Sequence, residues 1–347
     1  MATVEETARR LARLLSGGGD ALADAGRSDL VFEPRVDLRP LERTEPPPDT
    51  WAVDGGQALV ADARCLKVYL TRAATVRWQA GACVLEDAGD VEVHLLGAGQ
   101  DAVTAAGLRA EVARALAAGA GGATTPAPAL AGAGADVNLL RDWAEWRAVA
   151  AAVEAAQPGA LVLVDGDLRP DWRIPPAWMA SLLDRAEARA VTVAGVTKHS
   201  SLSRGGAPLV GELERQAAAA LGPRATWWAQ VARTRPDPDA AGTAGGAGLA
   251  VVVARLDPDA RFAFRVDLPA GAGPARALGA LAAVSDDAAF PGYPYPLSVA
   301  DRLAACPGWL RADVRADLVA GLDRAGVSPE VQERAFADRH RLMERSG

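Results

Sequence analysis

The sequence predicts an α/β fold in which a mixed β-sheet is flanked by helices, with helical additions at both ends of the chain. Two observations predict it. Short apolar segments between residues 57 and 96 alternate with turn residues, as in an antiparallel meander of strands. Further along, an apolar strand at residues 161–164, a helix near residues 177–188 and a second strand at residues 190–196 follow in the order of a parallel strand–helix–strand unit.

The N-terminal region is expected to be an arm that precedes the sheet. Residues 1–26 have the apolar spacing of an amphipathic helix, with valine and leucine side chains on one side. The proline-rich residues 41–50 then favour an extended chain that leads into the first strand. We therefore expect residues 1–48 to form a helical arm with a proline-rich lead-in.

The remaining elements predict a main domain over residues 49–310. Asp136 is a candidate N-cap for a helix over residues 137–156. The apolar side chains of this helix recur at helical spacing, at Leu139, Leu140, Trp143, Trp146, Ala150 and Val153. The other predicted elements are helices near residues 102–118, 211–221, 275–283 and 298–304, loops at 119–134 and 236–248, and a β-hairpin of residues 249–255 and 261–268. Residues 311–347 are expected to be C-terminal helices that pack on this domain.

The composition is that of a globular protein with a sizeable core. Of the 347 residues 50% are hydrophobic, and the mean hydropathy is +0.04, which excludes a wholly disordered chain. No apolar run reaches the roughly 18–20 residues of a membrane span, and residues 1–17 lack the apolar centre of a signal peptide. The cysteines are odd in number and lack metal-ligand spacing, which predicts a reduced, cytoplasmic protein. The net charge of −7 argues against an extended basic surface for nucleic acid, but leaves open a local basic groove around an acidic centre.

Two aspartates share the same setting, an apolar strand followed by Asp and Gly. Asp165 follows residues 161–164 and precedes one glycine, whereas Asp54 follows residues 51–53 and precedes two. A carboxylate at the end of a buried strand is costly unless a partner compensates it, and a metal ion is a common compensator. Two turn carboxylates are the alternative. The repeated pattern favours neighbouring strands that deliver both carboxylates to one acidic site.

The order of the elements links these two aspartates. A meander, a helix and parallel strands with acids at their ends follow one another as in the ribonuclease H-like fold. In that fold the first strand and the later parallel strand lie side by side. Asp54 and Asp165 are therefore expected to lie close together.

Six short segments, in order along residues 50–305, resemble motifs of the NurA nucleases. They are AVDGG (52–56), LRDWAEW (140–146), LVDGDL (163–168), GVTKHSSLS (195–203), FRVDLP (264–269) and GYPYPLSVADRLA (292–304). The resemblance implies a ribonuclease H-like, manganese-dependent enzyme that resects DNA ends together with a hexameric ATPase of the HerA type.

The resemblance also implies roles for particular residues. Asp54 would be the metal ligand of the first strand, Glu145 the carboxylate of the helix, and Asp165 the ligand of the second strand. Near the end of the tyrosine–proline segment the family usually has a histidine, whereas this chain has Asp301, itself a good oxygen ligand. These four carboxylates are the expected metal ligands and, with Lys198, the expected catalytic residues.

The chemistry of phosphodiester hydrolysis calls for the same residue types. A water nucleophile must be activated and the charge on the leaving oxygen neutralised, and two divalent ions about 3.5–4 Å apart can do both. Mn²⁺ and Mg²⁺ favour carboxylate oxygens, so several acids and no cysteine are the ligand set expected for two such ions. Lys198, just beyond a strand, could hold the scissile phosphate.

Each of these residues also has an ordinary structural explanation. Glu145 lies off the apolar stripe and could pair with Arg141, four residues earlier, on a solvated helix face. Asp301 could be an acid that favours a helix start, and Lys198 a solvated loop lysine. Asp267, which alternates with apolar neighbours in its strand, is either structural or faces a pore.

Some aromatic and basic residues are weaker candidates for DNA contacts. Trp227 and Trp228 could stack on unpaired bases, although a tryptophan pair belongs more often to a core or a subunit interface. Arg72, Arg77 and Arg204 could contact the phosphate backbone.

The resemblance implies a DNA nuclease of the 5′–3′ exonuclease and single-strand endonuclease type that acts on broken ends in DNA repair. It further implies a homodimer docked on a HerA-type ATPase. A non-catalytic adaptor that regulates the ATPase is the first alternative; the aspartate at position 301 favours it, and the intact Asp54 and Asp165 oppose it. The second is an actin-like phosphotransferase, which would need another glycine-rich phosphate loop. Residues 242–248 are too irregular for that loop.

Overall fold

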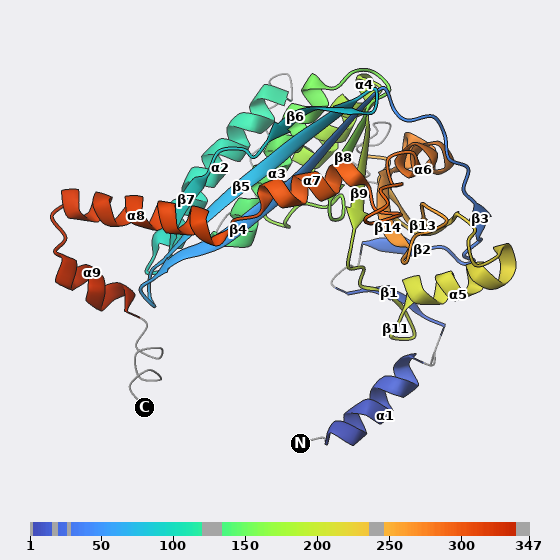
Figure 1. Cartoon of the computed structure of the whole chain (residues 1–347), viewed down its shortest axis with the longest axis horizontal. Helices are drawn as coiled ribbons and strands as arrows, with labels where there is room; N and C mark the ends of the chain where they lie inside the picture. Colours follow the sequence, from blue (N-terminus) through green and yellow to red (C-terminus); the bar gives the residue numbers. More distant parts are fainter. Residues whose placement is uncertain (1–2, 16–19, 26–28, 120–133, 236–245, 338–347) are drawn as a thin grey trace.

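A large mixed sheet forms the centre of the molecule (Figure 1). The computed structural model describes residues 3–15, 20–25, 29–119, 134–235 and 246–337, and within them the sheet has 11 strands. Their order is β2-β12-β13-β14-β9-β8-β4-β5-β6, with β3 paired to β12 and β7 to β5. The bounds are β2 (Leu30–Phe32), β3 (Arg39–Pro40), β4 (Asp49–Asp62), β5 (Lys67–Gln79), β6 (Ala82–Asp87), β7 (Glu92–Leu96), β8 (Leu161–Asp165), β9 (Thr192–Thr197), β12 (Trp227–Thr234), β13 (Leu249–Arg255) and β14 (Phe264–Pro269). The predicted α/β fold with a mixed sheet is confirmed.

The parallel part of the sheet consists of β4, β8 and β9. β8 runs parallel to β4 on one side and to β9 on the other, and Val53 lies opposite Val164. The other strand pairs of this sheet are antiparallel, including the β13–β14 hairpin that the sequence predicts. The register therefore brings the residues that follow Val53 and Val164 to the same point of the sheet.

The first strand differs from its prediction. The short segments at residues 51–53 and 58–60 belong to one long strand, β4, which pairs with β5 from Asp49 to Asp62. Asp54 therefore lies in the middle of a strand, and the two glycines after it are strand residues rather than a turn. β12 is a further strand that the sequence analysis did not predict.

Helices cover both faces of the sheet (Figure 1). Strand residues alternate between the faces, so Val53, Val162 and Val164 pack against one helix layer and Ala52 and Leu163 against the other. The first layer consists of α2 (Gln100–Gly119), α3 (Val137–Ala155) and α4 (Pro176–Ala188), and the second of α6 (Pro274–Ala282) and α7 (Tyr295–Ala304). α5 (Leu209–Leu221) packs on β12 and β13. The predicted Asp136 N-cap of α3 is confirmed, since its carboxylate accepts from the Leu139 N–H.

The N-terminal arm is only partly helical. α1 (Val4–Leu15) is followed by a strand, β1 (Leu22–Asp24), so the prediction of one helix over residues 1–26 is wrong. Three consecutive glycines at positions 17–19 give the sequence low helix propensity there. β1 pairs with β10 (Leu202–Arg204), which pairs with β11 (Ala207–Pro208) in a small separate sheet.

The C-terminal helices lie beside the far ends of β4 and β5 (Figure 1). Leu310, Val314 and Leu318 of α8 (Gly308–Arg324) and Phe336 of α9 (Pro329–Phe336) pack against a small apolar cluster on these strands. The predicted loops at residues 119–134 and 236–248 lie mostly outside the described residues. No helix in the described segments is long and apolar enough to cross a membrane.

A buried ion pair between Asp49 and Arg77 holds the start of β4 against β5. The Asp49 carboxylate is fully buried and accepts from Arg77 at 2.8 and 3.1 Å, from the Trp51 indole at 3.0 Å and from the Gln157 N–H at 3.1 Å. Burial alone would raise the pKa of Asp49, but these donors outweigh it and hold the pKa below its ordinary value. The carboxylate therefore stabilises the fold at neutral pH, and this stability is lost as the pH falls through the lowered pKa.

We expect Asp49→Asn to lower the free energy of unfolding by about 3 kcal/mol at pH 7, because it leaves Arg77 without its buried partner. Urea denaturation of both proteins at several pH values measures this difference. The gap should narrow below pH ~4, where the Asp49 carboxylate of the unfolded wild-type chain begins to take up a proton, and it should shrink further as the pH falls through the lowered pKa of the folded protein. Asp317→Asn, at an exposed position of α8, is the control. A gap that stays constant down to pH ~2 would contradict the role given to the Asp49 charge.

Candidate metal centre

Three aspartates converge at one point of the sheet. Asp54 of β4, Asp165 at the end of β8 and Asp301 of α7 each bring a carboxylate oxygen within 4.8 Å of the other two. Asp54 is buried, Asp165 is half-buried, and the side chain of Asp301 is 56% exposed. The cluster is therefore closed on the Asp54 side and open to solvent on the Asp301 side.

Glycines at positions 55 and 56 let helices approach β4 from both faces. A Cβ on Gly55 would lie 2.8 Å from Oε2 of Glu145 in α3, and a Cβ on Gly56 would lie 1.8 Å from the carbonyl oxygen of Ala304 in α7. A larger residue at position 56 would push α7 away from the strand, because the clash is with the helix backbone, whereas one at position 55 would displace the carboxylate of Glu145. The glycines after Asp54 are thus explained by close packing, whereas Gly166 after Asp165 has a φ of +129° and makes a true turn.

Glu145 lies behind Asp54 in the interior. It is 3% exposed, and its nearest cation is Arg141, whose Nη1 lies 3.7 Å from the carboxylate. Burial holds the pKa of Glu145 well above its ordinary value, and the charges of Asp54 and Asp165 raise it further. The pairing with Arg141 exists, but the prediction of a solvated helix face for it is wrong, because the glycines of β4 let this part of α3 pack closely on the strand.

The charges of the cluster repel one another. Burial, followed by the charges of Asp165 and Asp301, raises the pKa of Asp54 to about 7, although the Gly55 N–H donates to its carboxylate at 2.7 Å and Lys198 lowers the value. Such an excess of negative charge is unfavourable without a cation.

Lys198 supplies part of the missing positive charge. Its Nζ lies 2.7 Å from Oδ2 of Asp165 and 2.7 Å from Oδ1 of Asp301. Burial lowers the pKa of Lys198, but the hydrogen bonds to both carboxylates outweigh it and raise the pKa above its ordinary value. Lys198 follows β9 and is held by the cluster, so it is not an ordinary solvated loop lysine.

Tyr293 is a member of the site to which the sequence analysis gave no role. It is 3% exposed, and its hydroxyl donates to Oδ1 of Asp165 at 3.4 Å. Its ring centroid lies 5.3 Å from Nζ of Lys198. The tyrosine–proline segment, which leads directly into α7, was the feature of the sequence that could have indicated a role for Tyr293. Its contact with Asp165 could not be predicted, because it depends on the tertiary fold.

Asp301 does not lie at a helix start. α7 begins at Tyr295 and ends at Ala304, with Pro296 in its first turn, so Asp301 is in the last turn. A carboxylate is disfavoured there by the helix dipole. The explanation of Asp301 as a helix-start acid is therefore wrong, and its position is explained by the cluster it joins.

The weaker DNA-contact candidates have structural roles. Trp227 and Trp228 are 1% and 6% exposed and belong to the core, which excludes stacking on bases. Arg72 is buried and donates to the carbonyls of Ala304 and Ala305 at the end of α7. Arg77 pairs with Asp49, Arg204 with Glu212, and the fully buried Asp267 with Arg265. These polar side chains are engaged within the protein.

The residues present fit a divalent metal ion. The five predicted site residues lie close together in the structure. Four of them are carboxylates, and the positive charges near these carboxylates are those of Lys198 and Arg141. All of the ligand atoms on offer are oxygens, which suits Mn²⁺ or Mg²⁺. The charge excess that raises the pKa of Asp54 is what a bound dication would relieve.

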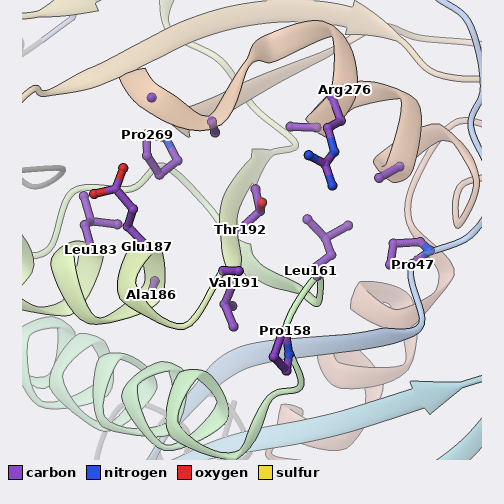
Figure 2. Close-up of a pocket in the computed structure, with 16 residues that line it drawn as sticks. Pro47, Pro158, Leu161, Leu183, Ala186, Glu187, Val191, Thr192, Pro269 and Arg276 are labelled. Carbon is purple, nitrogen blue, oxygen red and sulfur yellow. The ribbon is translucent and has the colours of Figure 1, made fainter.

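A separate cavity lies at the opposite end of the parallel strands. It has a volume of about 510 Å³ and opens where β8 and β9 begin, between α4 and α6. Figure 2 shows Leu161 and Thr192 on its strand side, with Arg276 reaching in from α6. None of the carboxylates of the cluster lines it, so the acidic site and this cavity are distinct.

Comparison with known proteins identifies the fold. No protein-family model and no curated protein matches the chain. Among solved structures, the NurA nuclease from Sulfolobus solfataricus matches with a TM-score of 0.56 at 14% identity, over 93% of this chain and 95% of that chain. A structure of NurA with manganese matches with a TM-score of 0.46 at 9% identity, over 82% of this chain and 91% of that chain. Human endonuclease V matches with a TM-score of 0.32 at 14% identity, over 87% of this chain and 96% of that chain. The first match confirms that the chain has the fold of NurA over nearly its whole length.

Proposed function

We propose that this protein is a metal-dependent DNA nuclease that hydrolyses phosphodiester bonds at the aspartate cluster. The observation that carries the proposal is the convergence of Asp54, Asp165 and Asp301, with Glu145 behind them, in a chain with the NurA fold. A non-catalytic adaptor would have no use for a dense group of carboxylates whose mutual repulsion is unfavourable.

The proposed site would bind two Mn²⁺ or Mg²⁺ ions. Their ligands would be the carboxylates of Asp54, Glu145, Asp165 and Asp301. When bound, such ions supply an activated water and neutralise the charge on the leaving oxygen. The protein contributes the orientation of the ligands. The Gly55 N–H fixes the Asp54 carboxylate, and the Tyr293 hydroxyl contacts that of Asp165.

Lys198 would act on the substrate. Its ammonium group stands at the open side of the cluster, between the two more exposed aspartates. A positive charge placed there could bind a phosphate group of the substrate and stabilise the negative charge that develops during hydrolysis.

The proposed biological role is the processing of broken DNA ends. The motif resemblance and the shared fold support a 5′–3′ exonuclease and single-strand endonuclease that acts at DNA double-strand breaks. Cleavage of end-labelled single- and double-stranded oligonucleotides tests it. We expect cleavage in Mn²⁺ or Mg²⁺, none in excess EDTA, and recovery when Mn²⁺ is restored in excess. Full activity in EDTA would end the metal proposal, and no cleavage with either ion would favour the adaptor.

We also propose a homodimer that binds a HerA-type hexameric ATPase, on the basis of the resemblance alone. Size-exclusion chromatography with light scattering tests it on the purified protein with and without the ATPase. A dimeric mass and co-elution with the hexamer are expected. A monomer that elutes separately from the ATPase at micromolar concentrations would contradict both statements.

A further inference from the structure

A tryptophan stands exposed in the loop that follows the Asp165 strand. Trp172 lies in the loop between β8 and α4, and 70% of it is exposed. It occupies the tip of a turn closed by the Ile174 N–H, which donates to the Asp171 carbonyl at 2.8 Å. The Asp171 carboxylate accepts from the Arg173 N–H at 2.9 Å, as an Asx turn does. The indole is therefore presented outward by a well-defined turn.

The base of this turn is rigid. The side chain of Arg173 is 8% exposed and donates to both carboxylate oxygens of Asp171, at 2.8 and 2.7 Å. It also reaches Asp136 at 2.8 Å and the carbonyl of Gly134 at 3.1 Å. An aromatic side chain held on a fixed base loses less conformational freedom when a ligand covers it. Such an arrangement suits a contact surface.

The turn is connected to the metal centre at two points. Its loop begins directly after Asp165, and the Asp171 N–H donates to the carboxylate of Asp142 at 2.5 Å. Asp142 lies on α3, three residues before Glu145. Trp172 thus lies on a loop that is tied to the elements carrying two of the proposed metal ligands.

A groove with a volume of about 700 Å³ continues from Trp172 towards the start of β13. Leu168 and Leu249 give it apolar lining, and its charged lining consists of the guanidinium groups of Arg169 and Arg235 and the carboxylates of Asp29 and Asp171. The Asp171 carboxylate is paired with Arg173. The ion pair of Arg169 with Asp29, at 3.6 Å, is between exposed side chains and is easily exchanged for another anion. Arg235 is exposed and has no ion pair among the described residues.

We propose that this groove is a subsite for a single-stranded segment of the substrate. One unpaired base stacks on Trp172, and the phosphates beside it bind Arg169 and Arg235. The inference rests on the proposed nuclease function. Stacking on an indole suits every base, and arginine pairs with phosphate, so the groove combines the two contacts that bind single strands without sequence preference. A protein partner would explain the exposed tryptophan but not its link to the metal centre.

Trp172→Ala tests the subsite, with Trp309→Ala as the matched control, because Trp309 of α8 is 64% exposed and lies outside the groove. Fluorescence anisotropy of a labelled 12-nucleotide oligo(dT) in EDTA measures binding without cleavage. We expect Trp172→Ala to raise Kd about tenfold, Trp172→Phe to keep most of the affinity, and Trp309→Ala to have no effect. Arg235→Ala should lower the salt slope of log Kd by about one.

Kinetics in Mn²⁺ separate this subsite from a structural role. For Trp172→Ala the KM of the 12-mer should rise about tenfold with little change in kcat, and kcat/KM of a dinucleotide should fall less than that of the 12-mer. Equal losses on both substrates, or an unchanged Kd for oligo(dT), would overturn the inference. Unchanged oligo(dT) binding with lost co-elution of the ATPase would assign the tryptophan to a protein contact instead. If the wild type cleaves no DNA in Mn²⁺, the nuclease proposal fails, while the Kd comparison in EDTA still decides the subsite.

Discussion

Replacing Asp165 or Asp54 by asparagine is expected to reduce DNA cleavage at least about a thousandfold. Each variant removes a negative ligand from the cluster, and metal ions at such a site contribute several kcal/mol of transition-state stabilisation, with each 1.36 kcal/mol equal to a factor of ten in rate. Single-turnover cleavage of a labelled oligonucleotide in saturating Mn²⁺ measures the loss, and isothermal titration with Mn²⁺ shows whether metal binding is lost with it.

The fold should survive these substitutions. Burial and the neighbouring charges raise the pKa of Asp54 to about 7, so its charge is unfavourable in the metal-free protein. Asp54→Asn removes that charge, and the variant in EDTA should melt at the same temperature as the wild type or above it. Asp313→Asn, at an exposed position of α8, controls for charge change alone. Cleavage retained in both cluster variants would place the active site elsewhere.

Gly56→Ala is expected to have the second largest effect. The new methyl group would lie 1.8 Å from the carbonyl oxygen of Ala304 at the end of α7, and this oxygen is backbone, so the helix itself must move. Asp301 is one turn before Ala304 and would move with it. We expect the free energy of unfolding to fall by about 1–3 kcal/mol and cleavage to fall about a hundredfold, as a displacement of about 1 Å can cause.

Gly107→Ala is the matched control for this substitution. A Cβ at position 107 of α2 meets no atom within 4 Å, so alanine there should leave cleavage intact and stabilise the helix by up to ~1 kcal/mol. Urea denaturation and the oligonucleotide assay, applied to both variants, give the comparison. Wild-type stability and activity in Gly56→Ala would mean that α7 does not pack on β4 at this distance.

Local patterns in the sequence predicted most elements of the sheet region because each pattern has a local cause. Alternating and continuous apolar runs predicted the strands, and the N-cap at Asp136 predicted the start of α3. The patterns failed where pairing with a distant strand decides the outcome. β4 continues through two glycines because β5 pairs with it along its whole length. β12 forms between β13, the next strand of the chain, and β2, a strand near the N-terminus.

The sequence by itself determined the fold class, the paired Asp54 and Asp165, and the residue types that suit a divalent metal. It did so because parallel neighbouring strands place equivalent positions side by side, and Val53 does lie opposite Val164. Only the tertiary structure decided the rest. Helical periodicity placed Glu145 on the solvated face of its own helix, but the space above Gly55 makes that face the buried one. The bridge from Lys198 to Asp165 and Asp301 joins residues 33 and 103 positions apart, and no local pattern encodes such a contact.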